Sequence, residues 1–373
     1  MPSSLFTPFA LRGLTLANRV VVSPMCQYSA DDGSATDWHM QHLGMLTHSG
    51  AALVVIEATG VERDGRITPG CLGLYSDANE AALKRVIEGC RKFSKTPIGI
   101  QLAHAGRKAS AAVPWKGGGP LKPEDGAWQA VAPSAIPFSD GWHTPRALSL
   151  DEIDRIVQSF ATAARRALRI GLDEVELHIA HGYLMHSFLS PISNRREDAY
   201  GGSLKNRMRM PLRVAEAVRK AWPLDKPMGA RITGTDWLDA GFSLDDAVVF
   251  ARALKARGCD FVCVSSGGIM GKMTVPAAPG YLVPHAARIR READIPTRAI
   301  GLIVTPHQAE SVIAEGNADM VGLARAILDD PRWAWHAAEA LGATAAYPVQ
   351  YERVRATAWP GARLARPAAQ AAE

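Results

Sequence analysis

The feature that most constrains this chain is a series of short apolar runs, rich in Val and Ile, that alternate with longer stretches of helical periodicity. Short apolar runs are typical of strands buried on both faces, and amphipathic stretches between them are typical of helices that cover a parallel sheet. Eight such runs occur, at residues 19–23, 52–57, 97–102, 174–178, 228–232, 260–264, 297–300 and 319–322. Eight strand–helix units predict an α/β fold, a single (β/α)8 barrel.

Three of the expected helices, at 153–170, 245–257 and 306–315, carry start and stop signals. Each is preceded by Ser or Thr with Glu, Asp or Gln three residues later, which is the pattern of a capping box. Each is followed by Gly, which often ends a helix in a left-handed conformation. The capping pairs are Ser149 with Glu152, Ser243 with Asp246 and Thr305 with Gln308, and the closing residues are Gly171, Gly258 and Gly316.

An open, doubly wound sheet is the competing architecture. That fold usually carries a GxGxxG or GxxxxGKS/T string, and neither occurs here. The connection at 107–146 contains Trp, Pro and three successive glycines, and it is too long for an ordinary loop between a strand and a helix. We expect it to form a lid or hairpin over the barrel mouth, within one domain that spans residues 1–353. The Ala- and Pro-rich end, 354–373, is expected to be a partly flexible tail.

Composition places the chain among ordinary globular proteins, because 47% of its 373 residues are apolar and 21% are charged. The formal net charge of +5 is spread along the chain rather than gathered in a basic block, which argues against a nucleic-acid partner. Five Cys residues without a CxxC pair indicate a reducing compartment. No apolar run approaches about 18 residues, so we expect a cytoplasmic protein without a membrane partner.

Polar residues follow most of the expected strands. In a (β/α)8 barrel the active site lies at the carboxyl ends of the strands, so these residues are the candidates for chemistry. In chain order they are Pro24, Met25, Cys26, Gln27 and Tyr28, then Ala58 and Thr59, Gln101, His178, His181 and Tyr183, Arg231, Ser265 and Ser266, Gly301 and Arg325.

Two of these positions point to anionic groups. Arg231 ends an apolar run, where an unpaired guanidinium is costly to bury. It therefore requires either a carboxylate such as Glu176 or negative charge on a cofactor or substrate. Gly301 and Arg325 follow the last two strands, where many barrels bind a phosphate. A tight turn and a surface arginine account for these two residues equally well.

His178, His181 and Tyr183 place two imidazoles and a phenol after the fourth strand. Imidazole N–H groups could hold a substrate carbonyl oxygen while the phenol supplies a proton. Single histidines are often structural, and a zinc site with His186 as a third ligand is the rival interpretation. The spacing of the three histidines matches no zinc-hydrolase pattern.

Cys26 and Gln101 also allow two interpretations each. Cys26 is either a small buried hydrophobe or a thiol beside a redox cofactor. Gln101 ends the interior of a strand, where its amide must find partners, and hydrogen bonds to a heterocyclic ring would satisfy it.

Several strings in order, covering nearly the whole chain from Leu5 to Arg353, resemble the Old Yellow Enzyme family of flavin-dependent alkene reductases. They are NR at 18–19, SPMCQY at 23–28, EAT at 57–59, QLAHAGR at 101–107, HIAHGY at 178–183, LSP at 189–191, NRR at 194–196, YGG at 200–202 and NR at 206–207. Cys26, Tyr28, the His-x-x-His-x-Tyr form and PVQYER at 348–353 resemble the branch of YqjM and xenobiotic reductase A.

The resemblance implies a barrel that binds FMN non-covalently. NADH or NADPH would reduce the flavin and leave before an α,β-unsaturated carbonyl compound enters the same place. Residues that would contact FMN by this resemblance are Pro24, Met25, Cys26, Ala58, Gln101, Arg231, Gly301, Ala324 and Arg325. Ala324 departs from the family, which usually has Gly there, and any need for a positive φ would strain it.

The resemblance also implies roles toward the substrate. His178 and His181 would grip its carbonyl oxygen, and Tyr183 would donate a proton to the α-carbon after hydride reaches the β-carbon. Cys26 would tune the flavin potential and Tyr28 would line the pocket. Homodimers or homotetramers are implied, with Arg353 or Trp359 entering a neighbour's site. The alternatives are a metal-dependent barrel hydrolase that uses His178 and His181, and a non-catalytic flavin-binding protein.

Overall fold

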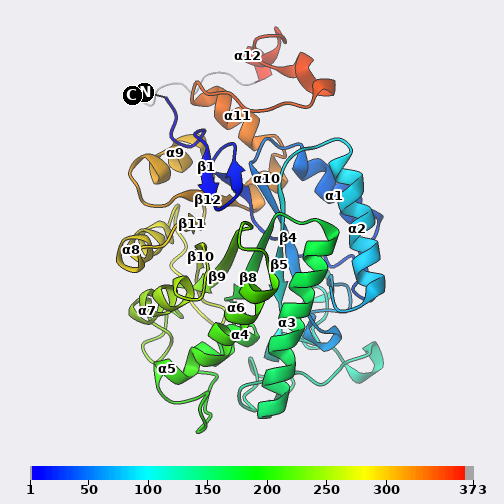
Figure 1. The fold of residues 1–373 in the computed structure, drawn as a ribbon, viewed down its shortest axis with the longest axis vertical. Helices are drawn as coiled ribbons and strands as arrows, with labels where there is room; N and C mark the ends of the chain where they lie inside the picture. Colours follow the sequence, from blue (N-terminus) through cyan, green and yellow to red (C-terminus); the bar gives the residue numbers. More distant parts are fainter. Residues whose placement is uncertain (1, 366–373) are drawn as a thin grey trace.

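The eight expected strands form a closed parallel barrel in the computed structural model, which describes residues 2–365 (Figure 1). Around the barrel the order is β10, β11, β12, β3, β4, β5, β8 and β9. Their bounds are β3 (Val20–Val22), β4 (Leu53–Gly60), β5 (Ile98–Ala103), β8 (Glu174–Ile179), β9 (Met228–Thr233), β10 (Phe261–Ser265), β11 (Thr297–Ala299) and β12 (Met320–Leu323). Each predicted run overlaps one of them, so the predicted barrel is confirmed.

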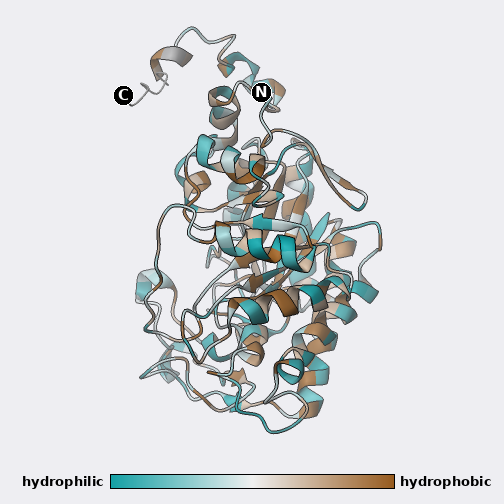
Figure 2. Cartoon of the chain, turned by 90° about the vertical axis from the view of Figure 1, so that its left-hand side faces the viewer, coloured by the Kyte–Doolittle hydropathy of each residue, from teal (hydrophilic) through white to brown (hydrophobic). Residues whose placement is uncertain are grey.

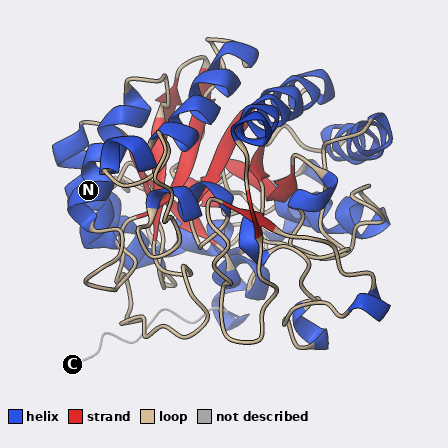
Figure 3. Cartoon of the chain, turned by 90° about the horizontal axis from the view of Figure 1, so that it is seen from below, coloured by secondary structure: helices blue, strands red, loops and turns tan. Residues whose placement is uncertain are grey.

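Helices surround the strands, and long loops connect them (Figure 3). The longer helices are α1 (Asp37–Thr47), α2 (Asp77–Arg91), α3 (Leu150–Ile170), α6 (Arg209–Ala221), α7 (Leu244–Lys255), α8 (Val283–Ala293), α9 (Pro306–Ala314) and α11 (Trp333–Ala340). The shorter ones are α4 (Leu184–Leu189), α5 (Leu204–Arg207), α10 (Arg325–Asp329) and α12 (Ala362–Ala365). Hydrophilic residues, in teal, are frequent on these outer helices (Figure 2). Within residues 2–365, no helix combines the length and apolar character that crossing a membrane requires.

The predicted helix caps are present with one difference. Ser149 and Ser243 each accept a hydrogen bond from the third residue of their helix, whose side chain accepts one in return. Thr305 accepts from the Gln308 amide, but the Gln308 side chain accepts from the Val304 amide instead of completing the box. Gly171 ends α3 with φ of 87°. Helix α7 ends at Lys255, two residues before its predicted end.

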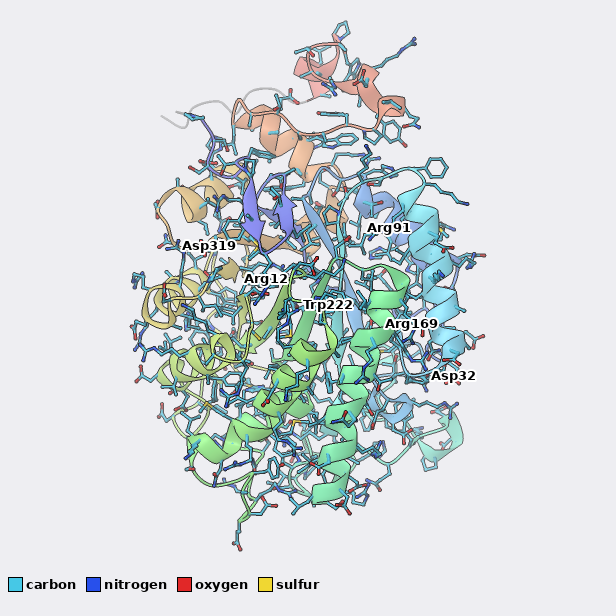
Figure 4. The ribbon with its side chains drawn as sticks, viewed as in Figure 1. Arg12, Asp32, Arg91, Arg169, Trp222 and Asp319 are labelled. Atoms are coloured by element: carbon cyan, nitrogen blue, oxygen red, sulfur yellow. The ribbon has the colours of Figure 1, made fainter. Side chains whose placement is uncertain are left out.

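An antiparallel hairpin closes the amino-terminal end of the barrel. It comprises β1 (Phe9–Leu11) and β2 (Leu14–Leu16), whose leucines Leu11 and Leu16 pack against Leu53 and Phe261 of the barrel. In its turn, Arg12 Nε donates to Asp260 Oδ1 at 2.5 Å (Figure 4). The hairpin is not among the predicted elements, because strands of three residues leave little periodicity in a sequence.

Charged side chains occupy the barrel interior. Glu174 and Glu176 on β8 and Arg298 on β11 are fully buried, and the Arg298 guanidinium lies 4.5 Å from the centre of the Phe261 ring. The Phe261 ring fits beneath the guanidinium because residue 229 is glycine, since a Cβ at Gly229 would lie 2.1 Å from that ring. The interior therefore holds an ionic cluster below the residues of the mouth.

The connection 107–146 lies at the opposite end from the hairpin (Figure 1). It contains η2 (Gly106–Lys108), η3 (Pro114–Lys116), η4 (Pro123–Asp125) and the short strands β6 (Val131–Ala132) and β7 (Arg146–Ala147). These two strands pair in parallel, and an isolated antiparallel bridge joins Ala111 and Pro120 earlier in the connection. Arg107 fixes the connection from within, because its guanidinium donates to the carbonyl oxygens of Ile136, Pro137 and Ile269.

The carboxyl-terminal segment lies beyond the closed end of the barrel, where α11 and α12 are drawn at the top of Figure 1. Between them runs η5 (Val349–Val354), which contains Arg353. Tyr347 stacks on Trp335 of α11 with ring centres 4.2 Å apart, and Arg332 lies 5.1 Å from the centre of the Tyr351 ring. The predicted tail at 354–373 contains α12, and its residues 366–373 lie outside the described ones.

Candidate active site

Strand β8 places its functional side chains in layers. Side chains alternate between the two faces of a strand, so Glu174, Glu176 and His178 lie on the same face, one above another. The two glutamates reach Arg298 inside the barrel, and His178 stands above them at the mouth. On the neighbouring strand β9, Arg231 is the register partner of His178. A cation and an imidazole therefore stand side by side at the mouth.

A tight turn after β8 gathers the predicted substrate residues. The ring centre of His178 lies 5.0 Å from that of His181 and 4.7 Å from that of Tyr183. Two successive residues of the turn have positive φ, His181 at 61° and Gly182 at 76°. A side chain at Gly182 would bring its Cβ to 2.1 Å from the Gly268 carbonyl oxygen, so only glycine fits. The structure brings together the three residues that the sequence analysis grouped.

Hydrogen bonds of the two imidazoles constrain where their protons lie. His178 Nδ1 accepts from the Ala180 amide at 3.3 Å, so its neutral ring carries the proton on Nε2. That Nε2 lies 3.3 Å from His181 Nδ1, and His181 Nε2 lies 2.7 Å from the Ser265 hydroxyl. If the hydroxyl donates, His181 carries its proton on Nδ1, and two N–H groups face one another. A carbonyl oxygen is the kind of acceptor that satisfies both.

The ionisation of these groups suits proton donation. Burial, and next to it the charge of Arg231, holds the pKa of His178 and of His181 well below the usual range, so both rings are neutral at neutral pH. Burial also raises the pKa of Tyr183 well above its ordinary value, so its phenol keeps its proton. The three groups are hydrogen-bond donors without a net charge.

Lys108 is a further residue at this turn that the sequence analysis did not single out. Its Nζ donates to the His181 carbonyl oxygen at 2.9 Å and lies 5.1 Å from the centre of the Tyr183 ring. Burial, followed by the charge of Arg107, lowers the pKa of Lys108 to about 8. Its position directly after the QLAHAGR string could have indicated a place at the mouth, but that position also lies at the start of the predicted lid.

The segment after β3 is held by a buried carboxylate. The Gln27 amide donates to Glu57 Oε2 at 3.0 Å, which fixes the loop next to Pro24, Met25 and Cys26. Burial, then the neighbouring Cys71 and Glu57, raises the pKa of Cys26 well above its ordinary value, so Cys26 remains a thiol. Tyr28 packs edge-on against Trp115, with ring centres 5.9 Å apart. Tyr28, Lys108 and Phe138 border a cavity of about 240 Å³.

Arg231 has no acidic partner among residues 2–365. The carboxylate considered for it, Glu176, instead accepts hydrogen bonds from Arg298 and from Gln101. Arg231 Nε is buried without a hydrogen-bond partner. A cation placed in this way fits the negative charge that a reduced flavin carries at its ring, so the residues present suit FMN.

The other predicted flavin contacts lie at the ends of neighbouring strands. Ala58 lies where the register between β4 and β5 shifts, and Gly301 follows β11 with φ of 104°. Ala324 precedes α10 and has φ of −122°, so this position does not need the positive φ that would strain an alanine. Arg325 begins that helix and is exposed. These positions provide backbone amides and a cation at one edge of the mouth, as a phosphate requires.

His186 does not join the other two histidines at the mouth. Its Nδ1 accepts from the Gly182 amide at 2.8 Å, and its Nε2 lies 3.0 Å from Asp236 Oδ1. Within residues 2–365, no group of three or more His, Cys, Asp or Glu residues is arranged to hold a metal ion. His186, the third ligand in the zinc interpretation, therefore holds the turn after β8 through its hydrogen bond with the Gly182 amide.

Comparison with known proteins decides the family. The model of the NADH:flavin oxidoreductase / NADH oxidase family matches residues 4–343. The chain belongs to this family. An NADPH dehydrogenase of Geobacillus thermodenitrificans (strain NG80-2) is 44% identical over 355 residues, which cover 95% of this chain and 99% of the relative. An NADPH dehydrogenase of Listeria innocua serovar 6a is 43% identical over 353 residues, with coverage of 94% and 99%.

Solved structures agree with this family assignment. Morphinone reductase in complex with tetrahydroNAD is 28% identical, with a TM-score of 0.75 and 92% of both chains covered. The old yellow enzyme homologue from Zymomonas mobilis is 26% identical, with a TM-score of 0.74 and coverage of 93% of this chain and 95% of the other. The predicted Old Yellow Enzyme resemblance and cofactor are confirmed: this member of the NADH:flavin oxidoreductase family is a flavoprotein that uses FMN with NAD(P)H as reductant.

Proposed function

We propose that this protein is an ene-reductase, which uses NAD(P)H to reduce the activated C=C bond of α,β-unsaturated carbonyl compounds. The observation that carries the proposal is the convergence of two neutral imidazoles and a protonated phenol beside an unpaired guanidinium. The imidazoles come from His178 and His181, whose facing nitrogens lie 3.3 Å apart. Such a set binds a carbonyl oxygen and can stabilise the negative charge that grows on it.

FMN, when bound, would supply the hydride for the β-carbon after taking it from the nicotinamide nucleotide. The residues that would hold it are Pro24, Met25, Cys26, Ala58, Gln101, Arg231, Gly301, Ala324 and Arg325. Arg231 would face the pyrimidine edge of the ring, and the thiol of Cys26 would adjust the flavin potential. Gly301, Ala324 and Arg325 would bind the phosphate through backbone amides and one guanidinium.

The substrate would bind with its carbonyl oxygen between the imidazoles. Hydrogen bonds from His178 and His181 strengthen as the oxygen gains charge, so they act on the transition state more than on the ground state. Tyr183 would donate its phenolic proton to the α-carbon. Tyr28 would line the cavity that receives the rest of the substrate, covered by the connection 107–146.

We also propose that Arg353 acts across an interface in a homodimer or homotetramer. The segment that contains it packs on α11, at the opposite end of the barrel from the chain's own connection 107–146 (Figure 1). From that end of the barrel, Arg353 is placed to contact a second copy of the chain and not the barrel mouth of its own chain.

Stopped-flow kinetics of the two half-reactions test the proposed function. The purified protein should be yellow, and NADPH or NADH should bleach its flavin absorbance under anaerobic conditions. Adding a cyclic enone should then restore the absorbance with formation of the saturated ketone. Restoration by oxygen or quinones alone, with no enone or enal reduced, would leave an NAD(P)H-dependent flavoprotein and remove the ene-reductase assignment.

A further inference from the structure

A carboxylate lies directly beneath Gln101, inside the barrel. Gln101 Nε2 donates to Glu176 Oε1 at 2.6 Å, and Arg298 Nη1 donates to the other carboxylate oxygen, Oε2, at 2.8 Å. Gln101 is 2% exposed, and both charged residues are fully buried. The three side chains come from β5, β8 and β11, so this series of hydrogen bonds crosses the barrel interior.

The carboxylate determines which way the Gln101 amide points. An ionised carboxylate only accepts hydrogen bonds, so the NH2 end of the amide must face Glu176. The carbonyl oxygen, Oε1, is then available to a ligand, together with the second N–H of Nε2. The pyrimidine edge of a flavin carries an N–H donor beside carbonyl acceptors, and an amide of fixed orientation is complementary to that pattern.

Arg298 prevents Glu176 from turning elsewhere. Its Nη2 also donates to both oxygens of Glu174, at 3.1 and 3.2 Å, so one guanidinium holds two carboxylates. The guanidinium rests on the Phe261 ring, which fixes its plane. Because Glu176 is committed to Arg298 and Gln101, it leaves Arg231 free for the cofactor.

We propose that Glu176, anchored by Arg298, is a positioning residue that holds the Gln101 amide in the orientation that binds the flavin ring of FMN. Glu176 acts only through Gln101, because it lies one layer below the mouth. The inference rests on the proposed contact between Gln101 and FMN, and its test separates the two.

The decisive variant is Glu176→Gln. Its single amide oxygen can serve either Arg298 or Gln101, and the charged Arg298 is the stronger donor. The NH2 group of the new side chain then faces Gln101, whose amide must turn over and present NH2 to the flavin. We expect the Kd of the apoprotein for FMN to rise about tenfold, because a mismatched buried hydrogen bond costs about 1–3 kcal/mol. The absorption spectrum and two-electron potential of the bound flavin should also shift.

Glu174→Gln is the matched control. It replaces the other carboxyl group that accepts from the same arginine, but Glu174 does not contact Gln101. Its FMN affinity and flavin spectrum should stay within about twofold of the wild type, since its neutral oxygen still accepts from Arg298. Equal behaviour of E176Q and E174Q would overturn the inference.

Gln101→Ala tests the premise. If Q101A weakens FMN binding while E176Q does not, the positioning role is wrong and the proposed flavin contact stands. If Q101A binds FMN as tightly as the wild type, the contact and the inference both fail.

Circular dichroism of each apoprotein checks folding. Should E176Q not fold, Glu176→Asp and Glu174→Asp repeat the comparison, because shortening Glu176 alone withdraws the carboxylate from Gln101. Equal FMN affinities of that pair would overturn the inference.

Discussion

At the scale of single residues, the proposed chemistry depends on which nitrogen of His181 carries the proton. His178 has its proton fixed on Nε2 by the Ala180 amide, whereas His181 has two partners, with its Nδ1 3.3 Å from His178 Nε2 and its Nε2 2.7 Å from the Ser265 hydroxyl. When that hydroxyl donates, His181 Nδ1 becomes a donor toward the substrate. Ser265 therefore positions the proton without touching the substrate, as second partners of ligand-binding histidines commonly do.

Removing this hydroxyl should weaken one step selectively. Ser265→Ala leaves His181 Nε2 without its partner, so the tautomer with the proton on Nδ1 is no longer favoured. We expect alkene reduction to slow about 5- to 10-fold, as for the loss of one hydrogen bond, while flavin reduction by NADPH changes less. Stopped-flow measurement of both half-reactions checks this. Ser265→Thr retains a hydroxyl and should recover most of the rate; an equally slow S265T variant would contradict the tautomer argument.

The phenol of Tyr183 gives a second prediction at this scale. Burial keeps it protonated, and Tyr183→Phe removes its proton while leaving the ring in edge-to-face contact with His178. Alkene reduction should fall by about 100-fold or more, in the range of general acid catalysis, whereas flavin reduction should be nearly unchanged. Rapid-mixing kinetics with an enone provide the measurement. A similar loss in both half-reactions would assign Tyr183 to binding instead of proton donation.

Residues of the mouth were predictable because strand ends in a barrel collect functional groups. His178, His181 and Tyr183 could be grouped from their spacing alone, and the structure places their rings within contact distance. Partner choice inside the barrel was not predictable. Glu176 could have paired with Arg231, because the two residues lie on adjacent strands. It pairs with Arg298 instead, a residue within the short seventh run that the sequence analysis did not single out. The spacing of residues in the sequence does not indicate which side chains meet across the barrel interior.

At the scale of elements, the turn after β8 is the most constrained part of the site. Gly182→Ala would add a Cβ at 2.1 Å from the Gly268 carbonyl oxygen to a residue with φ of 76°. The turn must then move, so the variant should lose more than 2 kcal/mol of the free energy of unfolding, about twice the cost of left-handed backbone strain alone. Alkene reduction should fall as His181 and Tyr183 separate.

Gly202→Ala is the control for that change. Gly202 has a similar φ of 74°, but nothing lies within 4 Å of an added Cβ. It should lose only about 1 kcal/mol and keep its alkene reduction, because strain without a clash stays local. Chemical denaturation and enone kinetics of the two variants are the measurements. Equal destabilisation would mean that the contact with Gly268 does not constrain the turn.

Element prediction succeeded where a pattern extended over several residues. The eight buried strands and the capped helix α3 follow from hydrophobic period and capping residues. The connection 107–146 has no such period, and Arg107 at its start donates to the adjacent carbonyl oxygens of Ile136 and Pro137 and to that of Ile269, which is distant in the chain. Long-range anchoring of this kind leaves no local pattern.

At the scale of the whole molecule, the buried cluster links stability to pH. Burial raises the pKa of Glu174 from its ordinary 4.5 to about 7, although Arg298 opposes the shift. The folded protein therefore binds more protons than the unfolded chain in this window. The stabilising contribution is complete below pH 4.5 and is lost as pH rises through about 7, amounting to about 3 kcal/mol.

Glu174→Gln isolates this effect, because its side chain stays neutral at every pH. The difference in unfolding free energy between the wild type and E174Q should change by about 3 kcal/mol between pH 4.5 and 8, with the wild type losing stability as pH rises. Urea denaturation at several pH values gives this difference. A difference that is independent of pH would show that Glu174 is ionised throughout.

The proposed role of Arg353 makes assembly part of the active site, and complementation between subunits tests it. A protomer with Tyr183→Phe keeps its own Arg353, and a protomer with Arg353→Ala keeps its own Tyr183. If Arg353 completes a neighbour's site, a mixed oligomer contains one site with both native residues. Co-expressed, differently tagged protomers should therefore recover about half of the wild-type alkene reduction in a dimer, although each variant alone is slow. A dimer of a protomer that carries both substitutions with the wild type has no site with both native residues if Arg353 acts across the interface, so this control mixture should stay slow. Mixed oligomers no faster than the mean of the two separate variants would show that Arg353 does not complete a neighbour's site.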